Sequence, residues 1–150
     1  MSLKQKLQSD LNEAIKSRNT VSAETIRMIL AAITNEEVAG KEKKELSDAE
    51  IITVLTREAK KRREAAEAFD AGGRADRAAA ERAEGEVIAG YLPEQLSEDD
   101  VKKLIAETIA AVGAAGPSDM GKVMGSLKAK VAGKADGALV SSLVKEALNK

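Results

Sequence analysis

The sequence contains no cysteine and no histidine among its 150 residues. Without cysteine a chain can form neither a disulfide bond nor a thiolate nucleophile, and without histidine it cannot form a Ser-His-Asp triad. Most zinc sites also depend on these two side chains. The acidic residues form no recognisable metal-binding motif. The sequence therefore predicts a chain with no metal, no cofactor and no catalytic constellation of its own.

Aromatic residues are nearly absent: the chain has one phenylalanine, one tyrosine and no tryptophan. Its core must therefore be built from leucine, isoleucine, valine, methionine and alanine. The same lack removes the stacking platforms with which many proteins bind single-stranded RNA. Only two prolines occur, and 33% of the residues are charged, a composition that favours helices.

Long apolar runs are also missing, since no segment approaches the roughly 18 residues that a membrane-spanning helix needs. The first residues lack the apolar core of a signal peptide, so we expect a cytoplasmic protein that does not enter a membrane. The formal net charge is −1, which argues against a strongly basic nucleic-acid binder. Residues 118–150, however, carry six lysines against three acidic residues. This local excess suits phosphate contacts and equally suits an ordinary solvated surface.

Apolar periodicity predicts four helices before Pro93, over residues 2–18, 21–38, 48–70 and 74–90. In the first of them every fourth residue is apolar, which gives a stripe made of Leu3, Leu7, Leu11 and Ile15. Ser47 opens a capping box at the start of the third helix, and Gly40 fits the C-cap position of the second. The first two helices are joined by a short turn, so they should pack as an antiparallel hairpin.

Three further helices are predicted after Pro93, over residues 98–112, 118–132 and 137–149. Pro93 ends the fourth helix because proline disfavours helix at the preceding residue. Ser97 opens a second capping box, and Ser118 and Asp136 fit the N-cap positions of the last two helices. We therefore predict an all-α fold, with an N-terminal four-helix unit followed by a smaller C-terminal three-helix bundle. The predicted domains cover residues 1–93 and 94–150.

A hairpin of the third and fourth helices is predicted over residues 56–86, where Phe69 is the only large apolar side chain. We expect this hairpin to be largely exposed, as a spacer or a contact surface. It carries a secondary basic surface made of Lys60, Lys61, Arg62, Arg63 and Arg74. Acidic residues alternate with these cations at helical ion-pair spacing, so a self-neutralising solvated face is the alternative to phosphate binding.

Glycine and lysine are concentrated between Pro117 and Gly137. Gly121 and Gly125 share one side of a predicted helix, where a glycine costs about 1 kcal/mol relative to alanine. Either another helix packs closely on this side, or the backbone of a nucleic acid approaches it with lysines on the phosphates. The candidate RNA-facing residues are Gly121, Lys122, Gly125, Lys128, Lys130, Gly133 and Lys134.

The short segment from Gly133 to Gly137 also has two interpretations. Gly133 and Asp136 fit a helix stop followed by a helix start, which explains every residue except Lys134. Alternatively, the free amides at the start of the last helix could bind an anion beside Lys134. The Walker A pattern is absent.

Several of these segments, taken together, resemble the signatures of the GatB/YqeY-like proteins. The similar segments are residues 73–76, 91–97, 119–125 and 133–137, together with Arg27, Glu81 and the basic run 60–63. The resemblance covers essentially the whole chain and implies an all-helical protein in two parts. Free-standing members are small bacterial proteins of poorly defined function. The same module forms the tail of the GatB subunit in the glutamine-dependent aspartyl/glutamyl-tRNA amidotransferase, where it contacts tRNA.

The resemblance implies an amidotransferase-related label, that of a carbon–nitrogen ligase with glutamine as amido-N-donor. Transamidation needs an ammonia-releasing amidase and an ATP-dependent kinase site, so we expect no amide transfer by this chain alone. The leading hypothesis is a non-catalytic accessory protein that contacts tRNA or another RNA. The alternatives are a protein-interaction adaptor, which binds an amidotransferase or another partner through the 56–86 hairpin, and a component of an amidotransferase complex that is active only with its partners. The oligomeric state stays open.

Overall fold

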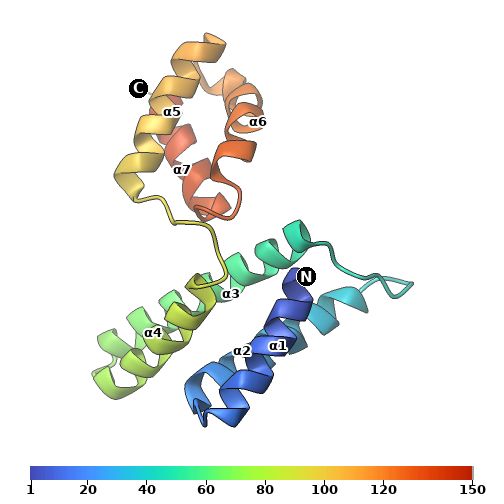
Figure 1. Cartoon of the computed structure of the whole chain (residues 1–150). Coiled ribbons are helices and arrows are strands. Elements are labelled where there is room, and N and C mark those ends of the chain that lie inside the picture. The colour runs from blue at the N-terminus through green and yellow to red at the C-terminus, as the bar shows by residue number, and fades with distance from the viewer. Residues whose placement is uncertain (150) are drawn as a thin grey trace. The chain divides into compact units, whose positions relative to one another are not determined.

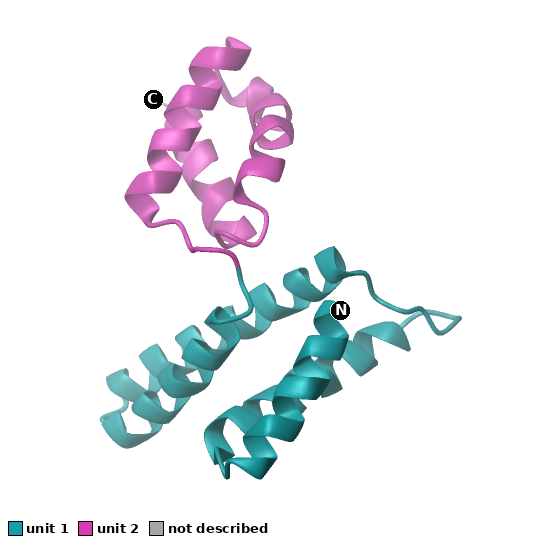
Figure 2. Cartoon of the chain, in the orientation of Figure 1, with its two compact units in different colours: residues 1–92 teal, residues 93–150 magenta. Residues whose placement is uncertain are grey.

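The computed structural model describes residues 1–149, and every regular element in that range is helical (Figure 1). The elements are α1 (Leu3–Lys16), α2 (Thr20–Glu37), α3 (Asp48–Ala71), α4 (Ala75–Ala89), α5 (Glu98–Val112), the 3₁₀ turn η1 (Pro117–Asp119), α6 (Met120–Val131) and α7 (Gly137–Leu148). The predicted all-α fold, with four helices followed by three, is confirmed. The chain divides into two compact units, residues 1–92 (unit 1) and 93–150 (unit 2), which Figure 2 colours separately.

Serine side chains determine where α1, α3 and α5 begin. Ser2, Ser47 and Ser97 each accept a hydrogen bond from the backbone N–H three residues later, and the side chain of that later residue accepts from the N–H of the serine. Each capping box satisfies backbone donors that the start of a helix leaves without intrahelical partners. The sequence predicts the boxes at Ser47 and Ser97, and both are confirmed.

Unit 1 consists of the helix pairs α1 with α2 and α3 with α4, and α2 also packs on α3 and α4. Its core draws aliphatic side chains from all four helices: Leu7, Ile26, Ile29, Ile33, Ile51, Val54, Leu55 and Ile88. The predicted stripe of α1 is correct at Leu7, which is fully buried, and wrong at Ile15, which is 48% exposed. Periodicity identifies the apolar face of a helix but does not show how far a neighbouring helix covers it.

The α3–α4 hairpin of unit 1 is packed through small side chains and closed by ion pairs. Ala66 and Ala78 are buried, and a Cβ on Gly85 would lie 3.8 Å from the Cβ of Arg62. The Arg62 guanidinium reaches across to α4, where it lies 3.1 Å from Glu81 and 3.3 Å from Glu84. Alanine buries little apolar area, so these charged contacts are a substantial part of what joins the two arms.

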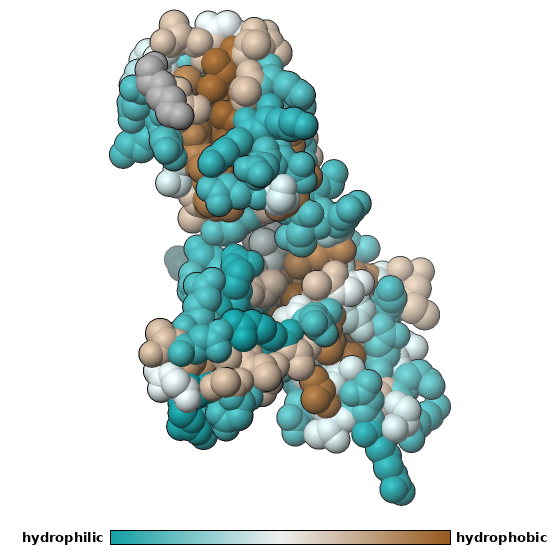
Figure 3. Space-filling view, turned by 90° about the vertical axis from the view of Figure 1, so that its left-hand side faces the viewer, coloured by the Kyte–Doolittle hydropathy of each residue, from teal (hydrophilic) through white to brown (hydrophobic). Residues whose placement is uncertain are grey.

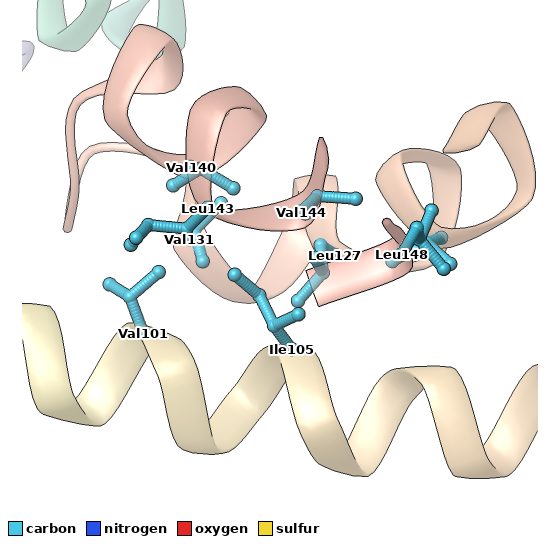
Figure 4. Close-up of a cluster of buried hydrophobic side chains, with 9 residues drawn as sticks. Val101, Ile105, Leu127, Val131, Val140, Leu143, Val144 and Leu148 are labelled. Carbon is cyan, nitrogen blue, oxygen red and sulfur yellow. The ribbon is translucent and has the colours of Figure 1, made fainter. Parts of the chain in front are cut away.

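Unit 2 is a three-helix bundle with an aliphatic core. In Figure 4, Val101 and Ile105 extend from α5 toward the valine and leucine side chains of α6 and α7. The one buried polar side chain of this unit within the described range is Thr108, whose hydroxyl donates to the carbonyl of Leu104 at 2.7 Å. Its polar atom is therefore satisfied, and the rest of the buried core is aliphatic.

Two predicted helix ends are wrong, one at the start of α6 and one at the end of α2. Ser118 does not cap α6, since residues 117–119 form η1 and Asp119 accepts a hydrogen bond from the N–H of Ala115 at 2.8 Å. The C-cap of α2 is Val38 and not Gly40. The chain folds back there because the carboxylate of Glu37 accepts a hydrogen bond from the N–H of Leu46 at 3.2 Å.

Candidate nucleic-acid interface

The glycines of α6 lie on its outer face. Gly121 and Gly125 are exposed, and a Cβ built on either would meet no atom of the described residues within 4 Å. The helix turns its opposite face, with Val123, Leu127 and Val131, into the core of unit 2. Packing against α5 or α7 is therefore wrong as an explanation of these two glycines.

Two lysines border the exposed glycines. Gly121, Gly125 and Lys128 follow one another at intervals of four and three residues, which places them on one side of the helix, and Lys122 is adjacent to Gly121. Both lysines are exposed, and neither forms an ion pair within residues 1–149. We call the surface made of Gly121, Lys122, Gly125 and Lys128 the glycine–lysine face.

Lys130 and Lys134, the other two candidate lysines, are placed differently. Lys130 is exposed in the last turn of α6, about half a turn around the helix from Lys128. Cations at this end of a helix also stabilise its dipole. Lys134 is half-buried in the following loop, where its carbonyl accepts a hydrogen bond from the N–H of Leu96 at 2.8 Å. Only Lys122 and Lys128 adjoin the two glycines.

Gln95 holds the loop that follows α6. Gly133 has a φ of 73°, in the left-handed region that glycine adopts without strain, so the predicted helix stop is confirmed. The side-chain amide of Gln95 donates to the carbonyl of Gly133 at 2.7 Å and to that of Pro93 at 2.8 Å. The role of Gln95 was not predicted, because a contact between distant residues leaves no periodic signal. Its position within the 91–97 segment was the only indication.

The start of α7 is less suited to an anion than the glycine–lysine face. Asp136 occupies the predicted N-cap position, but its side chain makes no capping hydrogen bond. Its negative charge lies where a phosphate would have to approach, and like charges repel there. Gly137, the first residue of α7, is exposed. We therefore leave this helix start outside the candidate interface.

The secondary basic residues of the hairpin are mostly engaged by carboxylates. Three of them lie near an acidic residue close in the sequence: Lys60 with Glu64 at 3.9 Å, Lys61 with Glu58 at 3.2 Å and Arg74 with Asp76 at 3.6 Å. Arg62 is turned toward α4, as described above. Arg63 is exposed and has no ion-pair partner in the part of the chain that the structure describes. These cations do not form one continuous positive surface.

A polar groove of unit 1 surrounds Tyr91. The Tyr91 hydroxyl donates to Oδ2 of Asp10 at 2.6 Å, and Nζ of Lys6 lies 5.4 Å from the centroid of the ring. Burial raises the pKa of the Tyr91 phenol well above its ordinary value of 10, and the hydrogen bond to Asp10 raises it further. The phenol therefore stays protonated at neutral pH, and its hydrogen bond fastens the end of unit 1 to α1.

Within residues 1–149, no three acidic side chains come close enough together to hold a metal ion. Of the described helices, none has both the length and the apolar character that crossing a bilayer requires. The glycine–lysine face itself offers positive charge beside a helix surface without side chains.

Comparison with known proteins relates the chain to one family. The model of the family described as Yqey-like protein matches residues 4–148. One relative is "Altered inheritance of mitochondria protein 41, mitochondrial" of Pyrenophora tritici-repentis (strain Pt-1C-BFP). It is 29% identical over 145 residues, which cover 94% of this chain and 78% of that protein. The family match spans parts of both units and includes every residue of the glycine–lysine face.

Proposed function

Because the chain belongs to the YqeY-like family, we propose that it is a non-catalytic accessory protein that contacts tRNA or another RNA through unit 2. The observation that carries this proposal is the glycine–lysine face, where Gly121 and Gly125 are exposed beside Lys122 and Lys128, two lysines without an ion-pair partner among residues 1–149. Alanine would make a more stable solvated helix at both glycine positions. The close approach of a phosphodiester backbone would explain why glycine occurs at these two positions, whereas packing within unit 2 does not explain it.

The proposed contact is electrostatic and depends on shape. Lys122 and Lys128 are about 9 Å apart along the helix axis, and each ammonium can bind a phosphate as a point charge. Lys130 and Lys134 extend the positive charge toward the end of α6. No aromatic residue occurs in α6 or α7. We therefore propose recognition of the RNA backbone without base stacking.

The first test measures tRNA binding by the full chain as a function of salt. Binding should weaken as salt rises, and in the Lys122→Ala/Lys128→Ala variant the slope of log affinity against log salt should fall by about 2. The matched control is Lys103→Ala/Lys145→Ala, which removes two exposed lysines from other helices of the same unit. Absence of binding at low salt, or an equal loss in both variants, would refute the proposal.

The second test changes shape without changing charge. The Gly121→Leu/Gly125→Leu variant fills the bare face with two side chains, and the open space above both glycines means that the fold should tolerate them. We expect unit 2 to be at least as stable and tRNA binding to be weaker. If binding is unchanged, the glycines are not a docking surface.

A catalytic test separates this proposal from an enzymatic one. Purified chain incubated with misacylated tRNA, ATP and glutamine is expected to give no amide product. Robust turnover by the chain alone would show that the non-catalytic proposal is wrong. Turnover that requires the other amidotransferase components would favour the alternative of a component in a carbon–nitrogen ligase complex.

A second candidate function uses the α3–α4 hairpin as a protein contact, with an amidotransferase among the possible partners. The pairing of hairpin cations with hairpin carboxylates favours it, because a neutralised surface suits a protein better than a polyphosphate. A complex that survives high salt and disappears when the hairpin is shortened would support this candidate.

We also propose a cytoplasmic location. The name of the fungal relative places that protein in mitochondria. The test is therefore whether a tagged copy of this chain is found in the cytoplasm or in mitochondria.

A further inference from the structure

Unit 2 has an open groove on a face other than the glycine–lysine face. It has a volume of about 420 Å³ and lies between α5 and α7, lined by Lys102, Ile105, Ala106, Ile109, Leu143, Glu146 and Ala147. Figure 3 looks at the side on which α5 lies in Figure 1 and shows apolar surface between hydrophilic side chains on this unit. Apolar atoms thus remain uncovered along the groove.

We propose that a second copy of this chain covers the groove, so that α5 and α7 of two copies form a two-fold dimer. In a two-fold contact each surface meets the same surface of its partner, so the patch has to be complementary to itself. The charges of the groove are compatible with this condition, because its apolar lining carries one cation, Lys102 on α5, and one anion, Glu146 on α7. Each copy can therefore set its Lys102 against the Glu146 of the other.

The side chains around the groove permit such a contact. Ala106 and Ala147 are small, so a second helix can approach closely, while Ile109 and Leu143 supply apolar area. Lys102 has one competing contact, to Glu98 at 3.7 Å, in which both side chains are more than half exposed. A surface pair of that kind holds a lysine weakly. Glu146 forms no ion pair within the described residues.

The size of the groove determines how strong the dimer should be. A patch of about seven residues on each copy is well below the 20 to 30 of a standard stable interface. The dimer should therefore be weak and should form as the protein concentration rises through the micromolar range. This inference does not depend on the proposed function, because the groove contains no residue of the glycine–lysine face.

Sedimentation velocity of the full chain over a range of concentrations tests the dimer by charge reversal. Lys102→Glu leaves only anions at positions 102 and 146, which we call the rim positions, and Glu146→Lys leaves only cations there. Because like charges would then face each other, each variant should dimerise at least about tenfold more weakly than the wild type. An equimolar mixture of the two variants should dimerise again, because opposite rims then meet. The double variant Lys102→Glu/Glu146→Lys should also recover dimerisation.

The matched controls are Lys103→Glu and Glu107→Lys, which make the same charge changes at exposed positions of α5 outside the groove. They should dimerise as the wild type does, and circular dichroism should show equal helix content in all variants. A wild-type chain that stays monomeric at every concentration would overturn the proposal and leave the groove open to another protein's helix. Single reversals that leave dimerisation unchanged would overturn it as well.

Discussion

Unit 1 and unit 2 both form helical bundles from aliphatic side chains, but they use charge in different ways. In unit 1 charged and polar groups connect distant segments: Glu37 is 3% exposed and binds Nζ of Lys4 at 2.9 Å as well as the N–H of Leu46. Arg62 joins α3 to α4, and Tyr91 joins the end of the unit to α1. In unit 2 the helices meet through an aliphatic core, and the lysines of α6 remain exposed and unpaired within the described chain.

This difference separates structural charges from charges that are free to bind a ligand. A cation paired with a neighbouring carboxylate is already partly neutralised, so it contributes little to the binding of an external anion. A cation on an outer helix face without a partner keeps its attraction for an external anion. The run of cations at residues 60–63 therefore belongs mainly to the first class, and Lys122 and Lys128 belong to the second.

The largest expected effect comes from a cavity in the aliphatic core of unit 2. Leu127→Ala removes a fully buried side chain and should lower the free energy of unfolding of this unit by about 2–5 kcal/mol. Tyr91 is the only tyrosine and the chain has no tryptophan, so its fluorescence reports on unit 1 alone. In a denaturant titration, amide NMR signals of unit 2 should disappear before the Tyr91 signal changes. Equal shifts of both transitions would show that the units do not unfold independently.

A smaller loss is expected from breaking the hairpin clamp of unit 1. Arg62→Met keeps the apolar stem but leaves Glu81 and Glu84 without their cation, which should cost about 1–3 kcal/mol. The neighbouring Arg63→Met removes the same charge at an exposed position without an ion-pair partner in the described chain, and it should change stability by less than about 0.5 kcal/mol. Tyr91 fluorescence during denaturation measures both. Equal effects would show that the clamp is not a stabilising contact.

Two glycine-to-alanine changes in unit 2 should have opposite signs. Gly125→Ala adds a methyl group to an open face in mid-helix and should stabilise the unit by about 0.5–1 kcal/mol. Gly133→Ala forces a side chain into a backbone with φ of 73° and should destabilise it by about 1 kcal/mol. Thermal unfolding followed by circular dichroism measures both changes. If Gly125→Ala lowered the thermal stability, the glycine–lysine face would have a role in packing.

The smallest effect is the acid sensitivity of unit 1. Lys44 and the N–H of Ser47 hold the pKa of Glu50 at about 2, and Lys4 and the N–H of Leu46 lower the pKa of Glu37 below its ordinary 4.5. Because both folded-state values are lowered, the stabilisation is present above pH 4.5 and is lost as the pH falls toward 2. Glu50 is 39% exposed, so water screens its charge and the loss should be modest.

Urea unfolding at a series of acidic pH values checks this dependence. The midpoint reported by Tyr91 should fall between pH 4.5 and 2, and Glu50→Gln should flatten part of that fall. The control is Glu45→Gln, an exposed carboxylate in the loop that precedes α3. A midpoint that rises with acid would contradict the assigned direction.

The sequence predicted the fold well because its signals are local. The serines at positions 47 and 97 and the spacing of apolar residues depend only on neighbours within one helix turn, and these features placed helices correctly. The errors arose where a distant partner decided the outcome. Gly40 was wrong as a C-cap because Glu37 binds Leu46, and Ser118 was wrong as an N-cap because the chain before α6 forms a 3₁₀ turn.

The candidate site was predicted in part. Lysines and glycines in one helix could be found from sequence, since residues three and four apart share a face. Whether that face packs against another helix could not be predicted from the sequence. It depends on how α6 is rotated about its own axis relative to α5 and α7, which is a property of the tertiary structure. The same holds for Gln95, whose contact with Gly133 joins two segments of unit 2 that are distant in sequence.

By itself, the sequence determined an all-helical chain with an aliphatic core, a break at Pro93 and a helix that contains two glycines and three lysines. These follow from backbone propensity, capping and periodicity, all of which act within a few residues. Only the tertiary structure decided which charged side chains pair with an opposite charge and which remain exposed. That distinction requires distances between residues far apart in the chain, such as Arg62 and Glu84 at 3.3 Å. It also requires knowing the space around Gly121 and Gly125, which is open because α6 presents its other side to the core.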